Sequence, residues 1–161
     1  LTDVIAVFVN PSVAQVDAVL QRVAVSVLQF HGDESAAFCN SFGVPYIKTL
    51  RVSDQDSLVT RCVGYPDAGA VLLDTHDVAL YGGTGRSFPW HLAREVARVP
   101  VILAGGLTEQ TVSEAIRLSG AYAVDVSSGV ETSPGVKDAN KVSRFARAVR
   151  DHDASVGGAH A

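Results

Sequence analysis

The stretch "VILAGGLTEQ" (residues 101–110) joins an apolar run to a polar segment through two adjacent glycines, Gly105 and Gly106. The apolar run has the pattern of a buried β-strand, and Thr108 is a residue type that often caps a helix. Glycines between a strand and a helix allow a ligand to approach the backbone closely. The stretch therefore predicts a strand–loop–helix unit whose loop can bind something through its backbone.

Similar apolar, β-branched runs occur along the rest of the chain. Including the strand of the first stretch, the six runs are "VIAVFVN" (4–10), "AVSVLQF" (24–30), "VPYIKTL" (44–50), "GAVLLD" (69–74), "PVILAG" (100–105) and "AYAVDVS" (121–127). Runs that are apolar almost without interruption are typical of a parallel sheet that is covered on both faces.

Helical patterns lie between these runs. Ser12 and Gln15 have the spacing of a capping box, and Thr108 is predicted to cap a helix that ends at Gly120. Asp33 is interpreted in the same way, as a helix cap rather than a catalytic residue. Strand–helix alternation of this regularity indicates an α/β fold.

The last helical pattern carries an apolar stripe that ends at Val149. Residues 151–161 carry no such stripe and are predicted to be a disordered tail. We therefore expect a single domain over residues 1–150, incomplete at its N-terminus.

Two architectures fit the alternation, a doubly wound sheet and a (β/α)8 TIM barrel. A dinucleotide-binding sheet needs G-x-G-x-x-G directly after a strand, and the sequence has none. The segment "YGGTGRSF" (81–88) is not a P-loop, because Arg86 stands where that motif needs lysine. The barrel is favoured, with about six of its βα units visible in this chain.

Composition narrows the classes of function. The chain has 161 residues, 47% of them hydrophobic and 19% charged, and a net charge of −4. The negative charge argues against a nucleic-acid partner, which needs a basic face, but not against a phosphorylated small molecule. No apolar run is long enough for a membrane span and no signal peptide is recognisable, so we expect a cytoplasmic location.

Two cysteines, Cys39 and Cys62, share no metal-ligand spacing with each other or with the histidines. They are expected to be small apolar side chains on helices that face the core. We predict no metal site.

Chemistry in α/β proteins lies at the carboxyl ends of the strands. The residues at the predicted strand ends are Asn10, Gln29, His31, Lys48, Arg51, Asp74, Gly105, Gly106, Asp125, Ser127, Ser128 and Gly129. Barrels commonly bind phosphate between the loops after their last two strands, which here end in "LAGGL" and "DVSSGVE". We therefore predict a phosphate site at Gly105 and Gly106 and at Ser127 to Gly129.

Three strand-end side chains are candidates for chemistry. Asp74 ends an apolar strand, where its surroundings favour the protonated acid that can donate a proton, although a helix-capping role is also open. Asp125 is either an acceptor for a substrate hydroxyl or a structural residue. His31 either faces the same site or is structural.

Several segments together resemble one enzyme family. They are "FVN" (8–10), "LQFHGDE" (28–34), "LLDT" (72–75), "YGGTGRSFPW" (81–90), "ILAGGLT" (102–108) and "VDVSSGVETSPGVKD" (124–138). In this order they resemble phosphoribosylanthranilate isomerase of tryptophan biosynthesis, and the resemblance runs from residue 4 to about residue 150.

The resemblance implies a (β/α)8 barrel that uses no cofactor and catalyses an Amadori rearrangement of N-(5′-phosphoribosyl)anthranilate. A general acid opens the furanose ring and a general base then removes the C2′ proton. The acid of "LLDT" corresponds to Asp74, and the phosphate loops correspond to those predicted above. The segment around Gly83 corresponds to a loop that closes over the substrate.

One part of the family pattern has no match here. The family base is a Cys in a "KICG" segment after its first strand, and an Arg after its second strand binds the anthranilate carboxylate. The run at residues 4–10 resembles the family's third strand, so the first two βα units are missing from the sequence. The chain begins with Leu1 and contains no Met, which favours a missing N-terminal segment over a partner subunit or a shortened descendant.

Two alternatives to the single-substrate isomerase stay open. One is a catalytically incomplete phosphate-binding barrel module, and the other is an isomerase that also serves histidine biosynthesis. In each case the expected partner is a small phosphoribosyl compound, with no nucleic acid and no membrane, and the protein is expected to be a monomer or a homodimer.

Overall fold

The computed structural model describes residues 3–52, 58–74, 90–96 and 99–157. The main sheet contains β1 (Ile5–Phe8), β2 (Val27–Phe30), β3 (Tyr46–Arg51), β4 (Ala70–Asp74), β5 (Val101–Ala104) and β6 (Ala123–Val124). The helices are α1 (Val13–Leu20), α2 (Ala36–Asn40), α3 (Leu58–Val63), the 3-10 helix η1 (Trp90–Glu95), α5 (Val112–Ser119) and α6 (Ala139–Gly157). A 3-10 turn, η2 (Ser128–Val130), leads into a hairpin of β7 (Glu131–Ser133) and β8 (Val136–Lys137).

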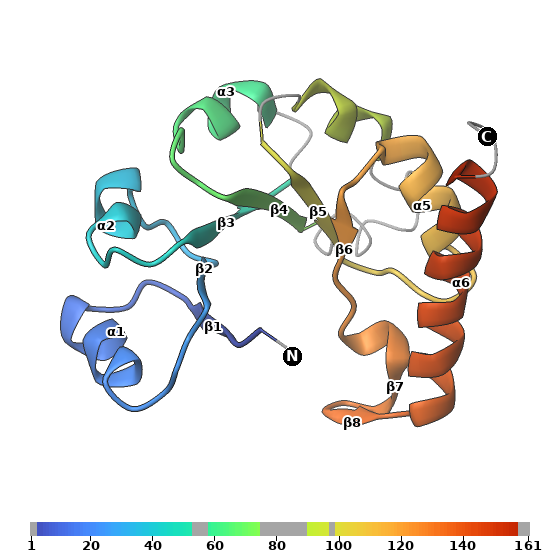
Figure 1. The fold of residues 1–161 in the computed structure, drawn as a ribbon, viewed down its shortest axis with the longest axis horizontal. Coiled ribbons are helices and arrows are strands. Elements are labelled where there is room, and N and C mark those ends of the chain that lie inside the picture. Colours follow the sequence, from blue (N-terminus) through green and yellow to red (C-terminus); the bar gives the residue numbers. More distant parts are fainter. Residues whose placement is uncertain (1–2, 53–57, 75–89, 97–98, 158–161) are drawn as a thin grey trace.

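The six strands pair in parallel and in the order of the chain, from β1 to β6. A doubly wound sheet would reverse its strand order at a switch point, and this sheet does not. Figure 1 shows the sheet curled, with the helices around its outer side. The predicted α/β barrel arrangement is confirmed, and the doubly wound alternative is excluded.

Among the described residues, β1 and β6 each have one neighbour in the sheet. A barrel closes by pairing its first strand with its last, whereas here the sheet stays open between β1 and the hairpin of β7 and β8 (Figure 1). Ile5 and Val7 are 45% and 57% exposed on β1, and Val9 just beyond it is 61% exposed. Because side chains alternate along a strand, these three apolar residues lie on the same face, toward the open side.

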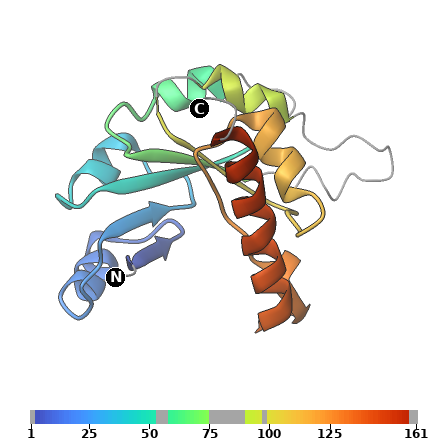
Figure 2. The same cartoon turned by 45° about the vertical axis from the view of Figure 1, so that its right-hand side comes forward.

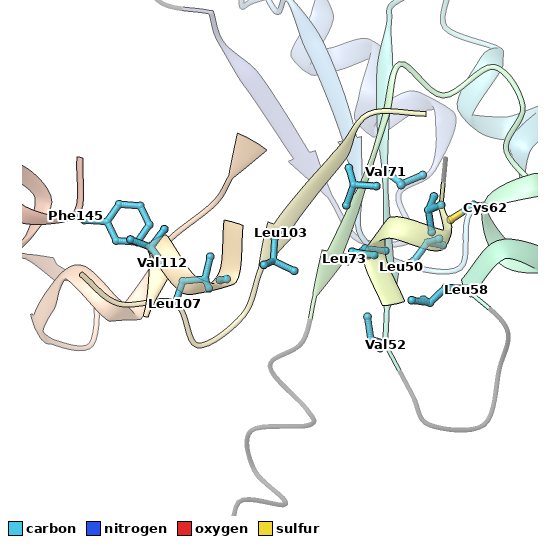
Figure 3. Packing of buried hydrophobic residues seen from close by; sticks show 14 of the residues in the cluster. Leu50, Val52, Leu58, Cys62, Val71, Leu73, Leu103, Leu107, Val112 and Phe145 are labelled. Carbon is cyan, nitrogen blue, oxygen red and sulfur yellow. The ribbon is translucent and has the colours of Figure 1, made fainter. Parts of the chain in front are cut away.

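The outer face of β3, β4 and β5 packs against helices. Leu50, Val71, Leu73 and Leu103 contribute from the strands, and the helices contribute residues such as Cys62, Val112 and Phe145 (Figure 3). These helices lie side by side over the strands in both Figure 1 and Figure 2. This core fixes the positions of β4 and β5, whose carboxyl ends carry Asp74 and Gly105.

A second core lies under α1 and α2 and is centred on Phe30. The Phe30 ring is fully buried and lies 5.8–6.2 Å, centroid to centroid, from four aromatic rings. Those rings belong to Phe8, Phe38, Phe42 and Tyr46. Cys39 is in the same cluster and Cys62 is in the first one, so the prediction that both cysteines face the core is confirmed.

The predicted helix starts and stops are partly correct. The capping box of Ser12 and Gln15 is present, and Gly120 ends α5 in the left-handed conformation with φ of 63°. Two predicted caps were wrong. Thr111 rather than Thr108 precedes α5, and Ser35 rather than Asp33 caps α2 by accepting a hydrogen bond from the Phe38 amide.

The predicted disordered tail at residues 151–161 was also wrong for its first part, because α6 continues to Gly157. The apolar stripe ends near Val149, and residues 150–155 are mostly exposed. An apolar stripe reports burial and not helicity, and a helix that has been nucleated extends residue by residue at little cost. None of the described helices has the length and apolar character needed to cross a membrane.

Candidate active site

The predicted site residues gather at one end of the sheet. Arg51, Asp74 and Ala104 are neighbours in the register of β3, β4 and β5, and Gly105 follows Ala104 directly. The amide of Asp125, just beyond β6, donates to the carbonyl of Leu103 at 2.9 Å. The sheet therefore brings Asp74 and both glycine-containing loops to adjacent strand ends.

Asp74 and His31 are in contact. His31 Nε2 lies 3.2 Å from Asp74 Oδ2, and their side chains are 27% and 21% exposed. Both residues lie on the inner face of the curled sheet, in line with Leu72 of β4 and Gln29 of β2, by the alternation of the strands. The contact therefore joins the ends of β2 and β4 on the face against which a ligand can lie.

A buried ion pair supports the loop that carries His31. Lys48 Nζ lies 3.0 Å from Glu34 Oε2, and both side chains are 2% exposed. Lys48 Nζ also donates to the carbonyl oxygens of Phe30 at 3.2 Å and Gly32 at 2.6 Å. Lys48 was predicted at a strand end, but it lies inside β3 and its ammonium group is enclosed by the turn that follows β2.

The Glu34 carboxylate accepts further hydrogen bonds from the backbone. The Asn10 amide donates to Oε1 at 2.7 Å, and the Gly32 amide donates to both carboxylate oxygens. Burial acts to raise the pKa of Glu34, but the hydrogen bonds from Lys48 and from backbone amides outweigh it and hold the pKa below its ordinary value. Glu34 is therefore charged in the folded protein at neutral pH.

Asn10 connects β1 to the same turn. Its side-chain Oδ1 accepts from the Asp33 amide at 2.7 Å, and its backbone has a φ of 48°, in the left-handed region. A Cβ at Gly32 would lie 2.3 Å from this Oδ1 and 2.8 Å from the Asn10 backbone nitrogen, so a side chain there would displace Asn10. Tyr65 completes the enclosure, because its hydroxyl donates to the Glu34 carbonyl at 2.9 Å and its ring lies 5.5 Å from Lys48 Nζ.

The loop after β5 has the backbone that its glycines predict. Gly105 and Gly106 have φ values of 86° and 66°, a region that residues with a Cβ avoid. Leu107 behind them is buried in the outer core. The glycines therefore allow an abrupt turn while the next residue anchors the loop.

The loop after β6 packs directly on the loop after β5. A Cβ at Gly129 would lie 1.9 Å from the Leu107 carbonyl oxygen, which is far inside contact distance. Within the described part of the chain, no hydrogen bond is found from the backbone N–H groups of Gly106, Ser128 and Gly129. Two touching loops that carry such N–H groups form a setting that suits an anion.

A lysine in the hairpin of β7 and β8 holds the loop after β6. Lys137 Nζ donates to the Ser127 carbonyl at 2.9 Å, to the Ser127 hydroxyl at 3.2 Å and to Glu131 Oε1 at 2.7 Å. Ser127 and Ser128 are exposed, as is the Asp125 side chain. Gly83 lies outside the described residues, as does most of the segment at 81–90.

The two cysteines lie away from this edge and are poor candidates for a base. Burial raises the pKa of the Cys39 and Cys62 thiols to about 11 each, so both stay protonated at neutral pH. Among the described residues, no three His, Cys, Asp or Glu side chains are placed to hold a metal ion.

Sequence reasoning missed the buried ion pair. A single lysine inside the apolar run "VPYIKTL" (44–50) was the available signal, because an unpaired lysine is almost never buried. Its partner Glu34 comes from another segment, and no local pattern connects the two residues.

Comparisons with known proteins point to one family. Residues 1–148 match the family described as N-(5'phosphoribosyl)anthranilate (PRA) isomerase. The N-(5'-phosphoribosyl)anthranilate isomerase of Neisseria meningitidis serogroup B is 47% identical over 142 residues. That alignment covers 88% of this chain and 68% of the relative.

Two solved structures are similar in fold. One is of monomers of the dimeric isomerase from Thermotoga maritima, with a TM-score of 0.78 and 29% identity, covering 93% of this chain and 73% of that one. The other is a phosphoribosyl anthranilate isomerase in complex with reduced 1-(o-carboxyphenylamino)-1-deoxyribulose 5-phosphate. It has a TM-score of 0.77 and 30% identity, covering 91% of this chain and 71% of that one. This chain belongs to the N-(5'-phosphoribosyl)anthranilate isomerase family.

Proposed function

We propose that this chain catalyses the rearrangement of N-(5'-phosphoribosyl)anthranilate to 1-(2-carboxyphenylamino)-1-deoxyribulose 5-phosphate, a step of tryptophan biosynthesis. The observation that carries the proposal is the His31–Asp74 contact at the same end of the sheet as two touching glycine loops. A phosphorylated sugar that lies across the inner face can contact the loops with its phosphate and Asp74 with its ring.

Asp74 is proposed as the general acid. Its carboxyl proton passes to the furanose ring oxygen and the bond from C1′ to that oxygen breaks. The lone pair of the anilino nitrogen, which keeps its hydrogen, then forms a protonated imine with C1′. Removal of the C2′ proton then gives an enolamine, which tautomerises to the ketone. The family resemblance assigns the base to a cysteine after a first strand that matches no segment here, and the buried thiols of Cys39 and Cys62 do not suit that role.

The substrate phosphate is proposed to bind the backbone N–H groups of Gly106, Ser128 and Gly129, with Gly105 and Ser127 shaping the two loops. Backbone N–H groups suit a dianion in a chain whose net charge is −4, because they attract phosphate without adding basic side chains. Asp125, exposed beside them, is proposed to accept a hydrogen bond from a sugar hydroxyl. Gly83 is proposed to contact the substrate from the segment outside the described residues.

The setting of the reaction is also proposed. The rearrangement consists of proton transfers and takes up no oxidant or reductant, so we propose that it uses no cofactor. We propose that the protein acts in the cytoplasm as a monomer or a homodimer, which light scattering on the purified protein would distinguish.

Loss of the anthranilate substrate, measured for the chain and for Asp74→Asn, tests the proposal. Asn keeps the shape of the side chain but cannot donate an acidic proton, so turnover should fall by roughly 10²–10⁴-fold. Asp17→Asn is the matched control, because Asp17 is exposed on α1 and its substitution should leave turnover unchanged. Undiminished turnover in Asp74→Asn would remove Asp74 from the mechanism.

The second candidate, a phosphate-binding module without turnover, is favoured by the buried thiols of Cys39 and Cys62, which do not suit the role of the base. Binding of the reduced product analogue without any turnover by the chain would support this candidate. Turnover that depends on Asp74 would exclude it.

A further inference from the structure

The buried charges of Lys48, inside β3, and Glu34, in the turn after β2, have no part in the chemistry proposed above. Lys48, Glu34 and Asn10 come from three different segments, and together they make seven hydrogen bonds at the turn that follows β2. An ion pair with both side chains 2% exposed is costly to desolvate and is weak evidence for a role in stability alone. A role in fixing one conformation of the turn accounts for the pair better.

The bonds converge on the residues around His31. The Phe30 carbonyl before it and the Gly32 carbonyl after it both accept from Lys48 Nζ. The Gly32 amide donates to the Glu34 carboxylate, and the Asp33 amide donates to Asn10 Oδ1. The amide of His31 itself donates to the Phe8 carbonyl at 2.8 Å. The backbone is thus held on both sides of His31, and only its side chain projects toward Asp74.

Because the backbone on both sides of His31 is held, the position of the His31 ring is restricted. His31 Nε2 meets Asp74 Oδ2 at 3.2 Å across β3, the strand that lies between β2 and β4. A small displacement of the turn would break this contact, because a hydrogen bond weakens steeply beyond normal distance and angle. The side chains of Lys48 and Glu34 are buried, so they do not reach a ligand on the inner face.

We propose that Lys48, Glu34 and Asn10 are positioning residues that hold His31 against Asp74 and thereby place the acidic proton for the reaction. The inference rests on the proposed function for its catalytic meaning, but the geometric part concerns the His31–Asp74 contact alone. Misplacement of a catalytic group by about 1 Å can lower a rate by about 10²-fold.

Asn10 offers a test that spares the buried core. Asn10→Gly suits the φ of 48° and removes the acceptor for the Asp33 amide, whereas Asn10→Asp keeps an oxygen at that place. Asn40→Gly is the matched control, because it also removes an exposed side-chain hydrogen bond, from Asn40 Nδ2 to Asp67, but outside this turn. Lys48→Met tests the buried side of the same arrangement.

The first measurement is the nitrogen NMR spectrum of the His31 ring in the chain. Asp74→Asn should move the Nε2 signal, and Asn10→Gly should move it in the same direction, while Asn10→Asp and Asn40→Gly should leave it near its original position. If Asn10→Gly leaves the signal unmoved while Asp74→Asn moves it, the positioning role is wrong. This measurement needs no turnover, so it stands even if the proposed function fails.

The second measurement is turnover in a double-mutant cycle. Asn10→Gly should lower kcat by about fivefold, the factor that one ordinary hydrogen bond is worth, with KM unchanged. In a His31→Ala background the same substitution should have no further effect on kcat, because its influence passes through His31. An equal loss in both backgrounds would overturn the proposal. Full activity of Asp74→Asn would instead refute the proposed function, and the NMR result would still decide the positioning role.

Discussion

The two ends of the candidate site are held by different kinds of contact. At β2 and β3 the turn is held by buried side chains, with Lys48 and Glu34 paired at 3.0 Å beneath His31. At β5 and β6 the loops consist of glycine and exposed serine, and the close contact is between backbone atoms, at Gly129 and Leu107. The rigid turn after β2 suits a side chain that must be held in one orientation. The loops after β5 and β6 suit a phosphate that is bound by several equivalent backbone donors.

The comparison predicts that the first end is the more costly to disturb. Lys48→Met leaves the Glu34 charge buried without its partner, so the free energy of unfolding should fall by about 3–5 kcal/mol, measured by urea denaturation. The double variant Lys48→Met/Glu34→Gln removes both charges and should recover part of the loss. A single variant as stable as the original chain would show that the pair contributes nothing to the fold.

Substitutions in the glycine loops after β5 and β6 should act through steric clashes rather than through charge. Gly129→Ala places a methyl group against the Leu107 carbonyl, so we expect about 1–3 kcal/mol of destabilisation together with weaker binding of the reduced product analogue. Gly69→Ala is the control, because its Cβ would meet the nearest atom at an ordinary 3.6 Å and the change should stay within about 0.5 kcal/mol. Unchanged affinity in Gly129→Ala, measured by calorimetry, would separate this loop from phosphate binding.

A smaller effect is expected from acid. The pKa of Glu34 is lowered in the folded chain because hydrogen bonds from Lys48 and backbone amides outweigh the opposing effect of burial. Its stabilisation is therefore complete above the unfolded pKa of about 4.3 and is lost as the pH falls through the folded value.

Unfolding free energies measured between pH 7 and pH 3 check this sign. The free energy of unfolding should decrease less steeply toward acid in Glu34→Gln than in the original chain. In the original chain, the decrease due to Glu34 should be smaller than the loss caused by Lys48→Met at neutral pH. Glu131 and Asp138, whose pKa values are also lowered by hydrogen bonds to Lys137 and to the Lys141 amide, are the same in both proteins. Parallel curves would mean that Glu34 is not the group that titrates.

The same contrast explains what the sequence could predict. The residue type alone predicts the unusual backbone conformation of Gly105 and Gly106. The apolar runs predict the parallel sheet, because strands that are buried on both faces are apolar almost without interruption. The family motifs led to Asp74 and to the phosphate loops, which remain predictions until a ligand is observed. The sequence leaves His31 either facing the site or structural, and the structure places it against Asp74.

The pair of Lys48 and Glu34 could not be predicted because it is long-range. Each residue is ordinary in its own segment, and only the folded sheet brings them to 3.0 Å. The misplaced caps at Asp33 and Thr108 have a related cause. Several polar residues can cap a helix, and the one that does is decided by how the preceding turn is held, here by Asn10 and Glu34 for the turn before α2.

The proposed reaction requires both ends of the site to act on one molecule. The most direct measurement is a crystal structure of the chain with reduced 1-(o-carboxyphenylamino)-1-deoxyribulose 5-phosphate. We predict its phosphate within about 2.7–3.2 Å of the Gly106 and Gly129 amides, with the sugar portion against the Asp74 carboxyl. A phosphate bound elsewhere, or an Asp74 carboxyl that makes no contact with the sugar portion, would contradict the account.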